Sequence, residues 1–491
     1  MVADRAEGED GGVRILVLGA SGLIGSSLVH DLANTLGMDR GAPAYRPVAV
    51  ARRFPRGPAP AGVERMEAPF VEMEPAALAA LLDAAAPAVI VNCVGVLQDP
   101  RGARTARASG ASGASGANGT TRASVGAGAN VLAVGSGGTH DVHAGFTARL
   151  VQAARSLRVP PTLVHLSVPG DPAQDATPFS RTKREGERIV EGSGLPHAIL
   201  RPGFVVTPSA YGGSALVRAL AMTPVGLSHR EAERPFAVVA AADIARTVAW
   251  IADERDAGRG ADLAARWDLM HPDTPSVEEV VEAHRQWLGG PRALMRAPAW
   301  LQGVGSVLAD AAGRLGWRPP IRSTALAELR RGITGEPREW MDRTGITPWG
   351  LAEALARHPA GVADRWFARL YPLKALVLAT LALFWIASGV VALLFAYDEA
   401  RAIVLRAGFG EAASHALTLA TGALDIVVGA LIAIRRTARA GLWTGIAVSV
   451  GYMAGATLLA PELWLEPLGS LVKTVPATVL ALLALATLDD R

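Results

Sequence analysis

The chain has few charged residues and almost no cysteine for its length of 491 residues. Only 19% of the residues are charged and 50% are hydrophobic, whereas a soluble domain typically has about 25% charged residues. The single cysteine, Cys93, excludes a disulfide framework and a cysteine-based zinc site within one chain. The net charge of +3 is small, and no basic stretch interleaved with aromatic residues points to nucleic acid. The composition therefore excludes a wholly disordered chain and favours membrane-spanning segments.

The first residues lack the apolar segment that a signal peptide requires. They read MVADRAEGEDGG, which is polar, acidic and rich in glycine. We expect residues 1–12 to form a disordered tail, and we expect the region that follows to stay in the cytoplasm.

Long apolar runs gather in the last quarter of the chain. A helix needs about 20 residues to cross the ~30 Å hydrocarbon core of a bilayer. Three runs meet this requirement, and a fourth is weaker because Lys473 and Pro476 interrupt it. The four runs are 375–396, 412–434, 441–459 and 468–488. We therefore predict a membrane domain with four spans.

Charges in the connecting loops predict the orientation of this domain. Arg435, Arg436 and Arg439 lie between the second and third runs, whereas Glu462 and Glu466 follow the third run. Cytoplasmic loops carry an excess of positive charge. Both ends of the membrane domain, and with them the N-terminal part of the chain, are therefore predicted to be cytoplasmic.

One acidic residue, Asp425, lies inside the second run. A charge at the centre of a bilayer costs about 2.5–3.5 kcal/mol on insertion scales, so we expect Asp425 to face the interior of the bundle. It could form a polar site for a small lipophilic substrate or a proton, or it could make a structural hydrogen bond between helices. Lys473 is a candidate partner for its carboxylate, and the alternative is that the Lys473 side chain extends to the outer surface of the membrane.

A glycine-rich turn near the start of the chain joins a predicted strand, residues 14–18, to a predicted helix, residues 26–33. Gly19 permits a tight turn, Gly22 lets the backbone approach a pyrophosphate, and Gly25 lets the helix pack closely on the strand. The start of the helix would offer unpaired N–H groups to the phosphates. The predicted cofactor-binding residues of this turn are Gly19, Ser21, Gly22, Leu23, Ile24 and Gly25.

The ends of two later strands predict which nucleotide binds. Arg52 and Arg53 follow a strand at the position where a site for NAD usually has an acidic residue, and arginine suits a 2′-phosphate. We therefore expect NADP to be favoured over NAD. Asn92 and Gly95 lie where the fourth strand would end above the cofactor. Cys93, between them, is expected to be an inert core residue.

With these motifs in place, residues 13–289 resemble the atypical, extended short-chain dehydrogenase/reductase family. The likeness is greatest to the NAD(P)-binding branch that includes the nucleotide-binding accessory subunit of respiratory complex I. The apolar tail is similar to the four-helix DoxX-like membrane domains that are fused to such reductases in bacteria. The first resemblance rests on the glycine turn, 92–95, 165–167, Lys183 with Glu185 and Glu187, 200–203 and 241–246, and the second on four spans with 421–425 and 461–465.

The resemblance implies an α/β Rossmann-like doubly wound parallel sheet, then a mostly helical linker lobe and an all-α four-helix transmembrane domain. The predicted domains are 13–289, 290–365 and 366–491. Residues 101–139 are rich in Gly, Ala, Ser and Thr and form a low-complexity insertion, either a tolerated loop or a lid. Ser276, with Glu279 three residues later, has the pattern of a helix-capping box. The implied location is the cytoplasmic membrane of a bacterium.

The catalytic pair of this family, a Tyr and a Lys four residues later, is altered in this chain. Phe179 stands where the Tyr is expected, and Lys183 follows at the spacing that puts both side chains on one helix face. The resemblance implies that Lys183 holds the nicotinamide ribose and that Ser167 is the active-site serine. Phe179 cannot transfer a proton. The alternatives are a solvated Lys183 and a Ser167 that only caps the backbone.

Two functions follow as hypotheses. The first is a membrane-anchored, NAD(P)H-binding oxidoreductase that acts on a quinone or another lipophilic substrate. The second is a non-catalytic NADP(H)-binding sensor, or an assembly or stability factor of a membrane complex. The expected partners are the lipid bilayer and either a lipophilic small molecule or a membrane redox complex. No cluster of His, Asp and Glu has the spacing of metal ligands.

Overall fold

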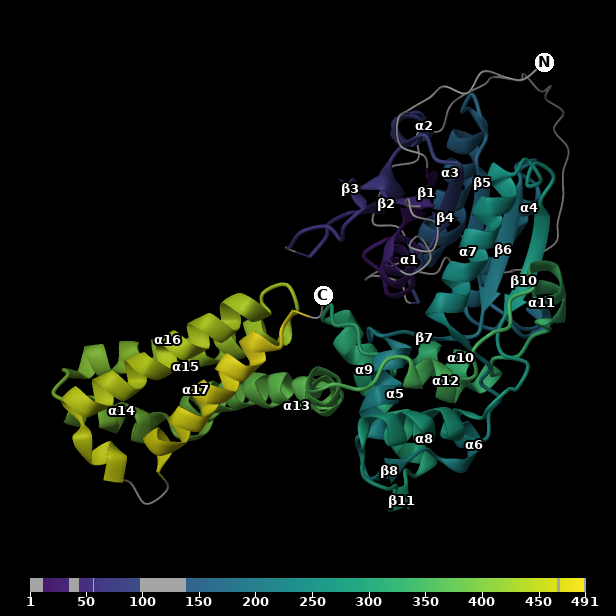
Figure 1. Cartoon of the computed structure of the whole chain (residues 1–491). Helices are drawn as coiled ribbons and strands as arrows, with labels where there is room; N and C mark the ends of the chain where they lie inside the picture. The colour runs from purple at the N-terminus through teal and green to yellow at the C-terminus, as the bar shows by residue number, and fades with distance from the viewer. Residues whose placement is uncertain (1–11, 35–43, 56, 98–137, 466–468, 490–491) are drawn as a thin grey trace, which may run out of the picture. The chain divides into compact units, whose positions relative to one another are not determined.

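A computed structural model of the chain describes residues 12–34, 44–55, 57–97, 138–465 and 469–489 (Figure 1). The predicted tail, 1–12, and insertion, 101–139, lie almost wholly outside these residues. Contacts divide the chain into two compact units, each built from separate segments. The two units are therefore discontinuous in sequence, whereas the domains predicted from the sequence are contiguous. The sheet unit comprises Met1–Gly203, Ala241–Leu269 and Gly335–Thr347, and the helical unit comprises Phe204–Ala240, Met270–Thr334 and Pro348–Arg491.

The sheet unit is built on seven strands, all paired in parallel. The strands are β1 (Val13–Leu18), β2 (Tyr45–Ala51), β3 (Glu64–Glu67), β4 (Val89–Asn92), β5 (Thr162–Leu166), β6 (His197–Pro202) and β10 (Ala264–Leu269). Their order across the sheet is β10-β6-β5-β4-β1-β2-β3. This order confirms the predicted doubly wound, Rossmann-like sheet, and it reverses direction between β1 and β4, where such sheets bind their ligands.

Helices cover both faces of this sheet, as parallel pairing requires. On one face, α1 (Leu23–Asn34) packs against α7 (Ala241–Asp256). On the other face, α3 (Phe146–Arg155) lies between α2 (Pro75–Ala85) and α4 (Pro178–Glu191) (Figure 1). The core between sheet and helices is formed by fully buried aliphatic and aromatic side chains, among them Leu16, Leu78, Ile90, Phe146 and Leu163.

A short helix from far along the chain completes the sheet unit. It is α11 (Arg338–Thr344), whose Trp340 is fully buried. The indole Nε1 of Trp340 donates a hydrogen bond of 3.0 Å to Thr247 Oγ1 on α7. Residues that the sequence predicted to lie in a linker lobe therefore contribute to the core of the sheet unit.

The helical unit has a small mixed part before its long helices. Its strands pair as β7 (Phe204–Val206) with β9 (Val238–Ala240) and as β8 (Val225–Gly226) with β11 (Met295–Arg296). Its helices are α5 (Gly213–Ala221), α6 (His229–Ala232), α8 (Val277–Leu288), α9 (Ala299–Arg314), α10 (Ser323–Arg331) and α12 (Leu351–Ala356). The predicted capping box is confirmed, because Ser276 and Glu279 each bond to the other's backbone N–H at the start of α8.

Four long helices form a bundle in the last part of the helical unit. They are α13 (Val362–Val390, extended by a π-turn over Val391–Phe395), α15 (Glu411–Ala433), α16 (Ala438–Leu459) and α17 (Ser470–Ala486), with the short α14 (Tyr397–Arg406) beside α15. Around the bundle, α13 contacts α15 and α17, and α16 contacts α15 and α17. Among the described residues, three helices are long and apolar enough to cross a membrane, and α17, at 17 residues, is shorter.

Glycines let two of these helices approach closely. A Cβ atom on Gly389 of α13 would lie 2.3 Å from the carbonyl oxygen of Gly422 of α15, and one on Gly429 would lie 2.6 Å from that of Ala382. Such contacts leave no room for a side chain. Small residues at helix contacts are typical of membrane bundles, where close packing takes over from the hydrophobic effect.

Candidate functional site

The glycine turn after β1 has the geometry of a phosphate-binding turn. Gly19 has φ +82°, a conformation that favours glycine, and a Cβ on Gly25 would lie 2.4 Å from the carbonyl oxygen of Gly19. Gly25 therefore has to be glycine for α1 to start where it does. A Cβ on Gly22 would lie 3.1 Å from the same oxygen and has no other close neighbour. Gly22 is thus the glycine whose missing side chain leaves space on the outer side of the turn.

The other predicted residues of this turn surround that space. Ser21 is exposed, whereas Leu23 and Ile24 are half-buried in the first turn of α1. The N–H groups of a helix's first turn have no partner within the helix and favour an anion. This cradle of backbone and glycine fits the pyrophosphate of a dinucleotide.

Arg52 and Arg53 directly follow β2, and both are exposed. β2 is the immediate neighbour of β1 in the sheet, and Gly19 N–H donates 3.0 Å to the carbonyl oxygen of Val50 near the end of β2. The two arginines therefore follow the strand next to β1, at the end of the sheet where the glycine turn lies.

Lys183, on α4, is buried between the ends of two strands. Its Nζ donates hydrogen bonds of 2.9 Å to the carbonyl oxygens of Val94, after β4, and Leu166, at the end of β5. A Cβ on Gly95 would lie 3.2 Å from the same Nζ, so the glycine makes room for the ammonium group. Burial lowers the pKa of Lys183 to about 8. The ammonium group has three N–H donors, which leaves one for a ligand at the sheet edge.

Asn92 is the last residue of β4, and its buried side chain makes hydrogen bonds within the protein. Its Oδ1 accepts 3.1 Å from Val94 N–H, and its Nδ2 lies 3.2 Å from Nδ1 of His165 on β5. Cofactor binding by Asn92 stays a prediction, and the observed contacts show it shaping the turn before Gly95. Burial raises the pKa of the Cys93 thiol to about 12, which agrees with the expected inert residue.

His143 is a buried residue of the site that sequence reasoning missed. It lies in a π-helical turn, Asp141–Gly145, before α3. Its Nε2 accepts 3.0 Å from Val96 N–H, so its Nδ1 carries the proton and donates 2.8 Å to Thr182 Oγ1 on α4. Burial lowers its pKa to about 2. A single histidine in a mostly apolar helix has no sequence signal that would distinguish it from a core residue.

Phe179, in place of the expected tyrosine, packs edge-on against the His143 ring, with 5.6 Å between the ring centres. His165, the second histidine near Lys183, has its pKa lowered to about 3 by burial. Both histidines are therefore neutral at physiological pH. Among the described residues, Phe179, His143 and His165 offer no acidic proton to a substrate at this edge.

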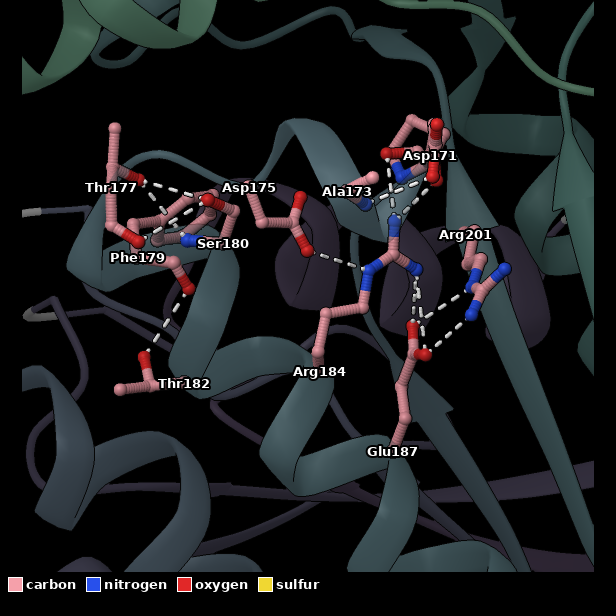
Figure 2. A network of polar contacts seen from close by, with 12 residues as sticks. Asp171, Ala173, Asp175, Thr177, Phe179, Ser180, Thr182, Arg184, Glu187 and Arg201 are labelled. Carbon is pink, nitrogen blue, oxygen red and sulfur yellow. Dashed lines mark hydrogen bonds and ion pairs between the residues drawn. The ribbon is translucent and has the colours of Figure 1, made fainter.

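A buried network of ion pairs lies beside the site and joins α4 to β6 and to the loop after β5 (Figure 2). Arg184 contacts Asp175 at 3.1 Å and Glu187 at 3.0 Å, and Arg201 of β6 contacts Glu187 at 2.5 Å. Arg184 also donates to the carbonyl oxygens of Pro169 and Gly170. The network thus fixes the loop that follows β5.

Ser167 begins that loop and is buried next to the network. Burial alone would raise the pKa of Glu187, but the hydrogen bond and ion pair with Arg201 hold it below its usual value. The Ser167 hydroxyl is buried and has no hydrogen-bond partner among the described residues. The catalytic role of Ser167 stays a prediction.

Asp425 lies inside the bundle, on α15, as the sequence predicted. Its Oδ2 accepts 2.8 Å from Ser388 Oγ on α13, and its Oδ1 accepts 2.8 Å from Tyr452 Oη on α16. These contacts are hydrogen bonds between helices, which was one of the two alternatives that the sequence left open for Asp425. Lys473, the candidate partner, is exposed on α17.

Comparison with known proteins finds a family match in the C-terminal part of the chain. Residues 382–482 match the family model of the DoxX-like family. Together with the three apolar helices, this match indicates that the chain is membrane-associated. Comparison with curated proteins finds no match.

Solved structures are similar to about three quarters of the chain. UDP-glucuronic acid 4-epimerase from Bacillus cereus, in complex with UDP-glucuronic acid and NAD, is 12% identical over 74% of this chain and 100% of its own, with a TM-score of 0.46. Human epimerase family protein SDR39U1 with NADPH is 16% identical over 71% and 99%, with a TM-score of 0.45. The Bordetella bronchiseptica enzyme WbmF with NAD⁺ is 13% identical over 74% and 96%, with a TM-score of 0.47.

Proposed function

We propose that this chain is a membrane-anchored, NADP(H)-binding oxidoreductase of the short-chain dehydrogenase type that acts on a lipophilic acceptor such as a quinone. The proposal places it in the cytoplasmic membrane of a bacterium, with the sheet unit and the C-terminus on the inner side. The observation that supports it most is the close-packed glycine turn between β1 and α1 in a chain that also has three membrane-capable helices.

Three groups of residues would hold the nucleotide in this proposal. Gly22 and the start of α1 accept the pyrophosphate, because backbone N–H groups face it without a side chain between. Arg52 and Arg53 pair with a 2′-phosphate, and the remaining N–H of Lys183 donates to the nicotinamide ribose. When bound, the nicotinamide supplies or accepts a hydride. The fit to NADP rather than NAD rests on the two arginines alone.

The chemistry of the site's own residues favours a quinone over a ketone as acceptor. Reduction of a ketone by hydride leaves an alkoxide that must be protonated, and a general acid typically contributes 10²–10⁴-fold to such a step. Phe179 has no proton to give, and neither neutral histidine is an acid. A quinone instead leaves a phenolate-like anion, whose conjugate acid has a pKa of about 10 as for tyrosine. Such an anion can take its proton later from water.

A non-catalytic role is the second candidate, as a nucleotide sensor or as an assembly factor of a membrane complex. The contacts of Lys183 favour it, because its ammonium group already bonds to two carbonyl oxygens. Lys183 then serves the fold and nucleotide binding without a reacting substrate.

Turnover with two acceptors separates these functions. NADPH oxidation by the detergent-solubilised chain is followed by absorbance with a short-chain quinone and with a simple ketone. We expect oxidation with the quinone only. Phe179→Tyr should add slow ketone reduction, whereas Phe179→Leu, which has no hydroxyl, should not. Bound NADPH that neither acceptor oxidises would favour the sensor, and ketone reduction by the unaltered chain would contradict the argument from Phe179.

A further inference from the structure

Helix α9 turns its large apolar side chains outward. Successive helical residues are about 100° apart, so Trp300, Val304, Val307 and Leu308 fall within an arc of about 100° on one side. All four are exposed, and Trp300 and Val307 are each 67% exposed. The residues of α9 that are buried are Ser306 and Ala309. A helix of a soluble protein has the opposite arrangement, with its apolar stripe packed inward. We call these four residues the α9 apolar face.

The C-terminal end of α9 is attached to one end of the membrane bundle. Arg435 N–H donates 3.0 Å to the carbonyl oxygen of Leu315, and Trp317 Nε1 donates 2.7 Å to the carbonyl oxygen of Ala433. The Arg435 guanidinium also lies over the Trp317 ring, at 5.4 Å from its centre. These contacts tie the segment after α9 to the loop between α15 and α16.

The length of α15 indicates that this end of the bundle reaches the surface of a bilayer that α15 spans. α15 ends at Ala433 and has 23 residues, which at 1.5 Å per residue give a length of about 35 Å. A hydrocarbon core is ~30 Å thick, so the ends of α15 reach the headgroups. The segment bonded to Ala433 therefore lies at headgroup depth, and α9 leads directly to it.

Charge around α9 is mostly positive. Residues 290–322 contain five arginines and one acidic residue, Asp310; Arg322 is paired with Asp310 and Arg296 with Glu278 of α8, which leaves a surplus of positive charge. Anionic lipids attract basic residues near a membrane surface by about 1 kcal/mol each. A second copy of the same helix would instead bring like charges together.

We propose that α9 lies in the membrane interface, with the α9 apolar face in contact with lipid and the flanking arginines at anionic headgroups. A helix with an apolar face, a basic flank and an aromatic residue is suited to this position. It gives the chain a membrane contact in addition to its spanning helices, and it comes before the first of them in the sequence. The proposal does not depend on nucleotide binding.

The test measures lipid contact at single positions of the full-length chain. Cys93 is replaced by Ala, and Val307→Cys is labelled with the environment-sensitive fluorophore NBD. Val159→Cys is the matched control, because Val159 is 69% exposed but belongs to the sheet unit. The protein is reconstituted in vesicles of phosphatidylcholine and phosphatidylglycerol with or without nitroxide-labelled lipids. We expect blue-shifted emission and quenching by the nitroxide lipids at 307, and neither at 159.

Two outcomes would overturn the proposal. The first is emission at 307 that equals that at 159 and is not quenched by lipid. The second is a blue shift at 307 without lipid quenching, together with energy transfer between labelled chains, which would identify a second copy as the occupant. Weaker quenching in vesicles of phosphatidylcholine alone supports the role of the arginines, whereas equal quenching contradicts it. NADPH titration of the same samples reports separately on the nucleotide site.

Discussion

Lys183 and Asp425 are both buried ionisable groups with neutral hydrogen-bond partners, but they differ in the hydrogen-bonding capacity that their contacts leave unused. Lys183 donates to two backbone carbonyl oxygens at the carboxyl edge of the sheet, and its third N–H remains for a ligand. Asp425 accepts one hydroxyl on each oxygen, from helices on either side. We therefore expect the lysine to take part in a binding site and the aspartate to join helices.

This difference predicts that the two residues control different properties. A change at Lys183 should act on nucleotide affinity, and a change at Asp425 should act on the stability of the bundle.

Lys183→Met should weaken NADPH binding by about 10- to 150-fold. A hydrogen bond from a charged donor is worth about 1.5–3 kcal/mol, and methionine keeps the length of the side chain without the donor. The effect on stability is expected to be smaller, because the loss of two hydrogen bonds is offset by the removal of a buried charge. Isothermal titration calorimetry measures the affinity.

Lys473→Met is the matched control for this change, because Lys473 is an exposed lysine. It should leave the affinity for NADPH unchanged. An unchanged affinity in Lys183→Met as well would show that Lys183 serves only the fold.

Asp425→Leu should destabilise the bundle by about 1–2 kcal/mol, the size of hydrogen bonds between membrane helices in model peptides. The change leaves the hydroxyls of Ser388 and Tyr452 without their acceptor. Asp425→Asn keeps an acceptor and should lose less. Unfolding in mixed detergent micelles measures both variants, and neither should change NADPH affinity.

One result would contradict this assignment. If Asp425→Asn keeps its stability but loses quinone-dependent NADPH oxidation, Asp425 is a functional residue of the bundle and does not act on stability alone.

Because of Lys183, NADPH affinity and the stability of the fold should respond to pH in opposite directions. Burial lowers its pKa from 10.5 to about 8, so between these values the unfolded chain binds more protons than the folded chain. The contribution of Lys183 to stability therefore rises with pH from about 8 to 10.5. Nucleotide affinity should fall over the same range, as the ammonium donor is lost. Thermal unfolding and NADPH titration at pH 7 and 9 measure both, and Lys183→Met should remove this part of each dependence.

Local spacing was enough to predict the glycine turn with the strand before it and the helix after it, whereas the doubly wound sheet was predicted from the family resemblance. The positions of Gly19, Gly22 and Gly25 have a direct steric meaning, which the close approach of Gly25 to Gly19 confirms. The long apolar runs 375–396, 412–434 and 441–459 were likewise enough to predict the three membrane-capable helices, which the structure places at 362–395, 411–433 and 438–459. The outward face of α9 could not be recognised in the same way, because its apolar spacing is that of a core helix.

Contacts between distant segments could not be predicted from the sequence. Trp340 lies 93 residues from its partner Thr247, and no local pattern indicates that α11 returns to the sheet unit. The partners of Asp425 were missed for a related reason. Charge favoured Lys473, whereas the packing of α13 and α16 on α15 brings Ser388 and Tyr452 to the carboxylate.

Nucleotide binding at the glycine turn is measured most directly by titrating NADPH and NADH against three chains. They are the unaltered chain, Gly22→Ala and Gly303→Ala, in which the control glycine has no atom within 4 Å of its added Cβ. We predict tighter binding of NADPH than of NADH, and a loss of about tenfold or more for both nucleotides in Gly22→Ala, because its methyl group occupies the approach of the pyrophosphate. Gly303→Ala should bind as the unaltered chain does. Equal affinities in all three chains, or no binding of either nucleotide to the unaltered one, would contradict the account.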